Sequence, residues 1–228
     1  MPVVSKDWDR YVAEAEEVAR SAGFQALRDR IIALSEPAPD EVVVDVGAGT
    51  GLLTLPIARV AKQVWAIDIS APMCDYLRAK SASAGLDNVD TAVASAISLP
   101  LVDASADLVV SNYCFHHLDH AGKRRALAEV HRVLRPGGRL VFGDMMFRVS
   151  VVDPRDRQVV ATKVKGMLRK GPGGMGRLVK NGVRFAGRRW EQPARAPWWE
   201  QALADAGFTA VTVEVLEHEG GIGKACRP

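Results

Sequence analysis

A glycine-rich turn follows a short apolar segment in the first quarter of the chain. Residues 42–51 read VVVDVGAGTG, so that Asp45 precedes three alternating glycines. Glycine lets a backbone approach a bound ligand closely and adopt dihedral angles that other residues avoid. Any tight connection between a strand and a helix can use such glycines, so the turn by itself predicts only a candidate ligand-binding loop.

An acidic residue ends the next apolar segment, 17 residues after Gly51. Residues 64–68 read VWAID, and a carboxylate at the end of a second strand can accept hydrogen bonds from both hydroxyls of a ribose. The glycines are spaced as GxGxG rather than as the GxGxxG of dinucleotide-binding enzymes. An oxidoreductase that uses a dinucleotide is therefore the less favoured alternative.

Three histidines follow a later apolar segment, where residues 111–120 read SNYCFHHLDH. Ligands of open α/β sheets bind beyond the carboxyl ends of the strands, which would bring His116 and His117 near a substrate. Either imidazole is a candidate general base near neutral pH, with His117 slightly preferred and Asp144 as the next choice. A structural turn is an equally good interpretation of each ring. No metal site is expected, because no carboxylates at ligand spacing accompany the histidines.

These residues need a scaffold, and alternating strand-like and helix-like segments predict one. The pattern favours βαβ units and a parallel sheet that is covered on both faces. Strands are expected at 41–46, 63–68, 89–94, 106–111 and 138–144, and helices at 51–61, 72–84 and 121–134.

The two ends of the chain differ from this repeating pattern. Residues 7–34 predict one or two amphipathic helices, so that 1–40 would form a helical cap ahead of the sheet. Near the other end, 198–207 predicts a helix that stops at a glycine, followed by strands at 208–216 and 221–226. With 228 residues, the chain fits a single domain.

A basic segment interrupts the pattern at about 145–197. Residues 148–195 hold 13 of the 30 Lys and Arg with only three acids, a net charge of +10 against −7 for the rest of the chain. We expect a helix from Asp153-Pro154 and a hinge at 171–176, which together would form a lid over a pocket. The alternatives are a solvated surface, or contact with an anionic small molecule, a nucleic acid or a membrane surface.

Several motifs in register resemble the class I S-adenosylmethionine-dependent methyltransferases, closest to the small-molecule branch that includes the quinone-biosynthesis enzymes. Besides the glycine turn, the motifs are LPLVDASADLVV at 99–110 and LAEVHRVLRPGG at 127–138, and the likeness spans about 40–145. The resemblance implies a doubly wound, mostly parallel seven-stranded sheet of Rossmann-like type with an antiparallel last strand. It also implies S-adenosyl-L-methionine as the cofactor.

The resemblance assigns a role to each residue of the glycine turn. Asp45 and Gly47 would lie by the amino-acid end of the cofactor, while Gly49 and Gly51 would let the turn pass its ribose and sulfonium. Asp68 would bind the ribose hydroxyls.

The resemblance also names residues for the adenine and for the end of the fourth strand. Ile69 would pack on the adenine. The family often has an acid where this chain has Ser95, so the adenine amino group would bind the Ser95 hydroxyl or the backbone of Ala96. Asn112 would complete the cofactor site.

The predicted function is transfer of a methyl group to a small-molecule acceptor, whether at oxygen, nitrogen or carbon. Residues 112–115 lack the prolines of the Asn-Pro-Pro-aromatic motif of amino-group methylases, which argues against a nucleic-acid or protein target. A nucleic-acid-binding or RNA-modifying protein that uses 148–195 is the remaining alternative. The apolar runs are too short to span a membrane, and the first residues do not have the layout of a signal peptide, so a cytoplasmic protein is expected.

Overall fold

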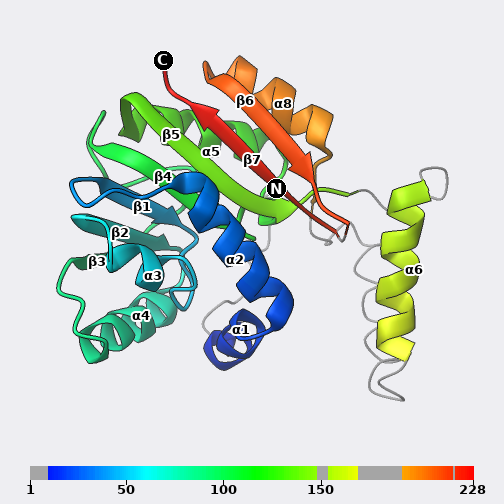
Figure 1. The fold of residues 1–228 in the computed structure, drawn as a ribbon, viewed down its shortest axis with the longest axis horizontal. Helices are drawn as coiled ribbons and strands as arrows, with labels where there is room; N and C mark the ends of the chain where they lie inside the picture. Colours follow the sequence, from blue (N-terminus) through cyan, green and yellow to red (C-terminus); the bar gives the residue numbers. More distant parts are fainter. Residues whose placement is uncertain (1–9, 148–153, 169–191, 218) are drawn as a thin grey trace.

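A computed structural model describes residues 10–147, 154–168, 192–217 and 219–228 of the chain (Figure 1). Its centre is a seven-stranded sheet with the strand order β3-β2-β1-β4-β5-β7-β6. This order confirms the predicted doubly wound, Rossmann-like sheet. The strands are β1 (Val42–Val46), β2 (Gln63–Asp68), β3 (Val89–Val93), β4 (Ala106–Asn112), β5 (Leu134–Met145), β6 (Thr209–Val215) and β7 (Gly220–Cys226).

Strand direction changes only at β7. β1 to β5 pair in parallel with one another, whereas β7 is antiparallel both to β5 and to β6. The predicted antiparallel last strand is thus confirmed, and it lies between β5 and β6 rather than at the edge. Because β1, β2, β4 and β5 run in parallel, their carboxyl ends lie at one edge of the sheet, where the candidate site residues follow them.

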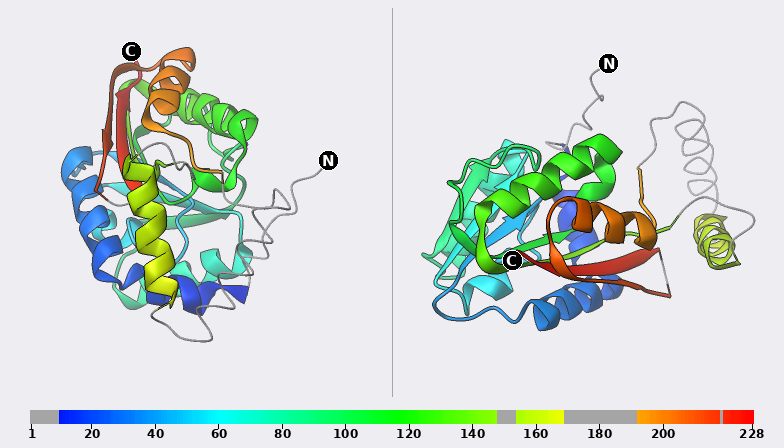
Figure 2. Two further views of the ribbon diagram at one scale, coloured as in Figure 1. Left: turned by 90° about the vertical axis from the view of Figure 1, so that its right-hand side faces the viewer. Right: turned by 90° about the horizontal axis from the view of Figure 1, so that it is seen from above.

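Helices cover both faces of the sheet, as the two views of Figure 2 show. On one face, α2 packs on β4 and β5, α3 on β2, and α4 on β2 and β3; on the other, α5 packs on β5 and α8 on β6. The helices are α1 (Val12–Ala19), α2 (Ala22–Ser35), α3 (Thr54–Ala58), α4 (Ala71–Ser83), α5 (His120–Val133), α6 (Pro154–Leu168) and α8 (Ala196–Asp205). The central strands are apolar on both sides because each side is buried: Val43 packs toward α2 and α3, and Val44 toward α5 and α8.

Side-chain caps start α4 and α5, the α-helices that come next along the chain after β2 and β4. The Ser70 hydroxyl accepts a hydrogen bond from the backbone of Met73 at the start of α4. Asp119 caps α5 in the same way, accepting from the Gly122 backbone at 2.6 Å. Such caps satisfy backbone N–H groups that the first turn leaves free, so they fix where each strand-to-helix loop ends.

Strand β5 begins earlier than expected. It starts at Leu134, directly after α5, and the register against β4 shifts between Ala106 and Leu108. Pro136, Gly137 and Gly138 therefore form an irregular stretch within the strand rather than a turn before it.

Of the segment that is predicted to form a lid, the structure describes residues 145–147, 154–168 and 192–197. Helix α6 confirms the helix that was expected from 153–154, and it lies beyond the end of β5, away from the sheet (Figure 1). The buried Asp156 of α6 forms an ion pair with Arg195, just ahead of α8. The expected hinge at 171–176 lies outside the described residues, and closure of the segment stays a prediction.

Candidate active site

The glycine turn passes from β1 to α3 with one position that faces open space. Gly49 has a φ of +52°, which disfavours side chains, and a Cβ atom at this position would meet no heavy atom within 4 Å. A Cβ at Gly51 would instead lie 2.4 Å from the Leu77 side chain, so this glycine lets the turn pack against α4. The open position supports a ligand approach at Gly49, while Gly51 has a packing reason of its own.

Asp68 binds the turn from the end of β2. One carboxylate oxygen accepts from the Gly49 backbone at 2.8 Å, and the other accepts from the Ser70 backbone at 2.9 Å. Burial raises the pKa of Asp68, and the hydrogen bonds from Ser70 and Gly49 oppose that rise. The carboxylate thus holds the turn and the start of α4 in one arrangement.

Asp45 lies beneath the turn rather than at its surface. It is 2% exposed, and the Thr54 hydroxyl donates a hydrogen bond to its carboxylate at 2.6 Å. Burial raises the pKa of Asp45 to about 7, and the neighbouring Asp68 charge adds to the rise. In the described residues Asp45 fastens the turn to α3; its expected place beside the amino-acid end of the cofactor stays a prediction.

Cys114 joins the glycine turn to the histidine segment. A Cβ atom at Gly47 would lie 2.5 Å from the Cys114 Sγ, so only glycine leaves room for this contact. Burial raises the pKa of Cys114, and the charges of Asp144, Asp68 and Asp45 act in the same direction. The Cys114 thiol therefore feels the charges of Asp45 and Asp68 at the glycine turn and also that of Asp144 at the end of β5.

The expected adenine residues lie beyond the end of β2 and β3. The Ile69 side chain is 54% exposed, as a surface that packs on a ligand would be. The Ser95 hydroxyl accepts from the Ile97 backbone at 3.4 Å within its own turn, and Ala96 packs against the core. Among the described residues, Asn112 Oδ1 is buried without a hydrogen-bond partner beside Gly143. The roles of these residues toward a cofactor stay predictions.

The two adjacent histidines lie in a short 3-10 helix, η2 (Phe115–His117), which a buried aromatic side chain anchors. Phe115 packs between Phe142 of β5 and Trp199 of α8, with ring centroids 5.6 Å and 5.9 Å away. This anchoring turns the next residue, His116, toward the end of β5.

His116 and Asp144 form a buried pair. The His116 Nδ1 lies 2.6 Å from one Asp144 oxygen, and the His116 backbone N–H donates to the other at 2.9 Å. The two residues are 3% and 0% exposed. An ionised carboxylate only accepts hydrogen bonds, so it selects the tautomer with hydrogen on Nδ1 and leaves Nε2 of the neutral ring as a proton acceptor.

His117 is placed differently from its neighbour. Its ring centroid lies 3.9 Å from that of His116, and the residue is only half-buried. The slight preference for His117 as the base therefore finds less support than His116, whose ring orientation a carboxylate fixes. Whether either ring touches a substrate stays a prediction.

Comparison with known proteins identifies the domain that carries this site. A family profile described as "Methyltransferase domain" matches residues 44–142, which run from within β1 to within β5 and include every expected cofactor residue. An uncharacterised methyltransferase of Geobacillus kaustophilus is 35% identical over 146 residues, or 63% of this chain and 64% of the relative. Residues 44–142 therefore belong to a methyltransferase domain of the class I S-adenosylmethionine-dependent kind.

Two further comparisons agree with this membership. A malonyl-[acyl-carrier protein] O-methyltransferase of Hahella chejuensis is 38% identical over 151 residues, which cover 62% of this chain and half of that protein. The methyltransferase also resembles the crystal structure of a SAM-dependent methyltransferase from Aquifex aeolicus, with a TM-score of 0.65, 20% identity, and coverage of 94% and 97% of the two chains. At that identity the structural likeness concerns the fold alone. Since the match spans less than two thirds of the curated relatives, their reactions are not transferred to this methyltransferase.

Lys123 is the residue of this methyltransferase site that sequence reasoning missed. It is fully buried in the first turns of α5, and its ammonium donates to the backbone carbonyls of Leu118 and Gln192. Its position could have drawn attention, because it shares the apolar face of α5 with Ala126, Leu127 and Val130. A lysine on such a stripe needs buried partners.

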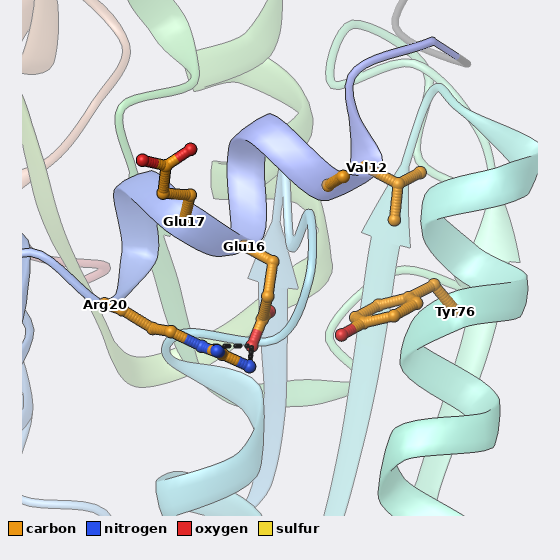
Figure 3. A pocket seen from close by; sticks show the side chains of 6 residues that line it. Val12, Glu16, Glu17, Arg20 and Tyr76 are labelled. Carbon is orange, nitrogen blue, oxygen red and sulfur yellow. Dashed lines mark hydrogen bonds and ion pairs between the residues drawn. The ribbon is translucent and has the colours of Figure 1, made fainter.

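A groove of about 480 Å³ lies between α1 and α4 of the methyltransferase (Figure 3). Val12, Glu16 and Tyr76 are among its lining residues, and none of the expected cofactor residues is. Glu16 accepts hydrogen bonds from Lys80, which also donates to the Thr50 carbonyl in the glycine turn at 3.1 Å. These contacts fasten α1 to the turn, while a helical cap over 1–40 stays a prediction.

Neither metal-binding clusters nor membrane-crossing helices occur in the part of the methyltransferase that the structure describes. No three His, Cys, Asp or Glu side chains there are grouped as metal ligands. None of the helices within the described ranges has the length and apolar composition that crossing a bilayer demands.

Proposed function

We propose that this domain transfers a methyl group from S-adenosylmethionine to an atom of a small-molecule acceptor, and that His116 receives the acceptor's proton. The observation that carries the proposal is that the glycine turn with Asp68 and the buried His116–Asp144 pair lie at one edge of the sheet, joined through Cys114. One half can hold a nucleoside, and the other can take a proton.

The residues present fit the cofactor. A carboxylate has about four lone-pair sites, and the backbone N–H groups of Gly49, Ser70 and Ile69 bind Asp68, so one site remains for a ribose hydroxyl. Gly49 faces open space next to this carboxylate, and the exposed Ile69 follows it. We infer that Gly49, Asp68 and Ile69 hold the adenosyl part.

When bound, S-adenosylmethionine supplies a methyl group on a sulfonium, which is a good leaving group. The protein must then position the acceptor, exclude water and accept a proton where the acceptor carries one. An acceptor X–H yields X–CH₃, S-adenosylhomocysteine and a proton, and we assign that proton to His116 Nε2. The buried Asp144 stabilises the resulting imidazolium through Nδ1.

The class of acceptor is the open part of this proposal. The O-methyltransferase name of the Hahella relative makes an oxygen acceptor one candidate, while an acceptor already ionised as a phenolate or enolate would need no base. The basic segment at 148–195 would suit an anionic acceptor. We place the enzyme in the cytoplasm, as the sequence predicts.

Calorimetry with three ligands tests the proposed function. S-adenosylmethionine and S-adenosylhomocysteine should bind with one site per chain, whereas NADH and a random oligonucleotide should not bind at physiological salt. Binding of NADH alone would point to the oxidoreductase alternative. Oligonucleotide binding with a steep salt dependence would point to the nucleic-acid alternative.

A further inference from the structure

A buried lysine joins three segments around the His116–Asp144 pair. The Lys123 ammonium donates to the Leu118 carbonyl, which follows η2, and to the Gln192 carbonyl at 2.6 Å. The Gln192 N–H in turn donates to the His116 carbonyl at 2.7 Å. The peptide group at 192 is thus held on one side by the histidine turn and on the other by Lys123.

Gln192 lies between the basic segment and α8, so the contacts have a topological consequence. The chain leaves the sheet shortly after Asp144 at the end of β5 and returns through Gln192 onto the backbone of His116. The chain therefore leaves the sheet next to one member of the buried pair and returns onto the backbone of the other. At Gln192 the returning chain is bound by the side chain of Lys123, and three residues further on Arg195 forms its ion pair with Asp156.

The charges around the pair come from each element that packs on it. Asp144 on β5 and Asp119 at the start of α5 both favour the charged form of Lys123, while His117 and Tyr113 place their rings against His116. His120 on α5 is exposed and feels the Lys123 charge. Asp144 has no solvent exposure, so its charge needs compensation from within the cluster.

Burial opposes that charged form and lowers the pKa of Lys123 to about 8. Either form of the side chain has enough N–H donors for the two carbonyls, but only the ammonium carries the charge that faces Asp144 and Asp119. With a pKa of about 8, Lys123 carries that charge near neutral pH.

We propose that Lys123 is a positioning residue for methyl transfer. Its ammonium holds the chain at Gln192 against the histidine turn, where the chain returns after the basic segment. It also balances the charge of Asp144, so that the His116 ring stays neutral. This inference rests on the proposed function, in which His116 accepts the acceptor's proton. Without the cation, the uncompensated carboxylate would draw a proton onto His116, and the ring would lose its acceptor atom. A purely structural lysine would change stability but not the protonation of a neighbouring ring.

The test compares Lys123→Gln, Lys123→Arg and Lys123→Met with Arg125→Met, which changes an exposed residue of the same helix. Nitrogen NMR of protein with labelled histidines follows the His116 ring from pH 5 to 9. Lys123→Gln and Lys123→Met should shift its titration midpoint upward by about one pH unit, a tenfold change in proton affinity. Lys123→Arg should restore most of the parent behaviour, and Arg125→Met should leave it unchanged.

In the same proteins, amide hydrogen exchange at Gln192 reports whether the chain there stays bound to the His116 carbonyl. Exchange of the Gln192 N–H should accelerate at least tenfold in Lys123→Gln and not in Arg125→Met. Should Lys123→Met fail to fold, Lys123→Gln, which keeps a side-chain donor but no charge, still decides the matter. An unchanged His116 titration or unchanged Gln192 exchange in folded Lys123→Gln would overturn the proposal.

The same samples separate this inference from the proposed function. If the parent protein fails to bind S-adenosylmethionine by calorimetry, the proposed function fails whatever the histidine does. If the parent binds the cofactor and its His116 titration is independent of Lys123, only the role of Lys123 fails.

Discussion

The two halves of the site are built in opposite ways. The cofactor half consists of neighbouring residues on one turn and the next strand end, and its polar contacts are mostly backbone N–H groups that meet Asp68. The proton-accepting half gathers His116, Lys123, Asp144 and Gln192 from separate segments into a buried cluster. A local, backbone-made half suits a cofactor shared by a family, while a half assembled from distant side chains can change with the acceptor.

His116→Ala should have the largest effect, and it probes the assembled half. General-base help is typically worth about 10²- to 10⁴-fold in rate, so turnover should fall on that scale while cofactor affinity stays at the parent value. Rates over pH 6–9 can be measured once transfer of labelled methyl to a metabolite extract has revealed an acceptor. His120→Ala, at an exposed ring on Trp198, is the matched control.

A parent-like rate and pH profile in His116→Ala would mean that the assembled half supplies no base. The acceptor would then be one that needs none. The assembled half would then only position the acceptor, and the local half would still bind the cofactor.

The buried carboxyl group of Asp45, in the local half of the site, should make the free energy of unfolding depend on pH. The folded protein binds the Asp45 proton with a pKa of about 7, well above the ordinary value of about 3.9. Its contribution to stability is therefore present at low pH and is lost as pH rises from about 4 to about 7. Relative to Asp45→Asn, the parent should lose on the order of 4 kcal/mol across that window.

Urea unfolding of both proteins between pH 4 and 8 checks this expectation. Asparagine keeps an oxygen that can accept from the Thr54 hydroxyl, so the variant isolates the titrating proton. Parallel stability curves for the two proteins would show that Asp45 ionises at an ordinary pH.

How far the sequence alone leads depends on the same contrast between local and distant contacts. The strands and the glycine turn were predicted because buried parallel strands are continuous apolar runs and because a tight turn needs glycine. Pairing of Asp68 with the turn follows from the ends of adjacent strands. These features depend on short-range patterns.

The assembled half could be predicted only in part. His116 and Asp144 were both candidates, but their pairing depends on how Phe115 packs between β5 and α8, which no local pattern encodes. Lys123 was missed because the role of a lysine on an apolar helix face depends on its buried partners, here the carbonyls of Leu118 and Gln192. Gln192 contacts His116 across 76 residues of chain that include the basic segment.

Gly49→Val should weaken S-adenosylmethionine binding at least about 100-fold, roughly 3 kcal/mol, by filling the open space that the turn presents. Gly85→Val is the matched control, because Gly85 also has positive φ (+68°) and open space but lies at the end of α4. Calorimetry on both folded variants separates backbone strain from lost ligand space. Equal affinities in the two variants would mean that the turn does not face the cofactor.

The most direct test of the central claim is the affinity of Asp68→Ala for S-adenosylmethionine. Loss of hydrogen bonds to a charged group costs about 1.5–3 kcal/mol, so calorimetry should show binding weaker by roughly 10- to 100-fold than in the parent. The control Asp90→Ala removes an exposed carboxylate from β3 and should bind as the parent does. If folded Asp68→Ala also binds with the parent's affinity, the glycine turn and the end of β2 are not the cofactor site.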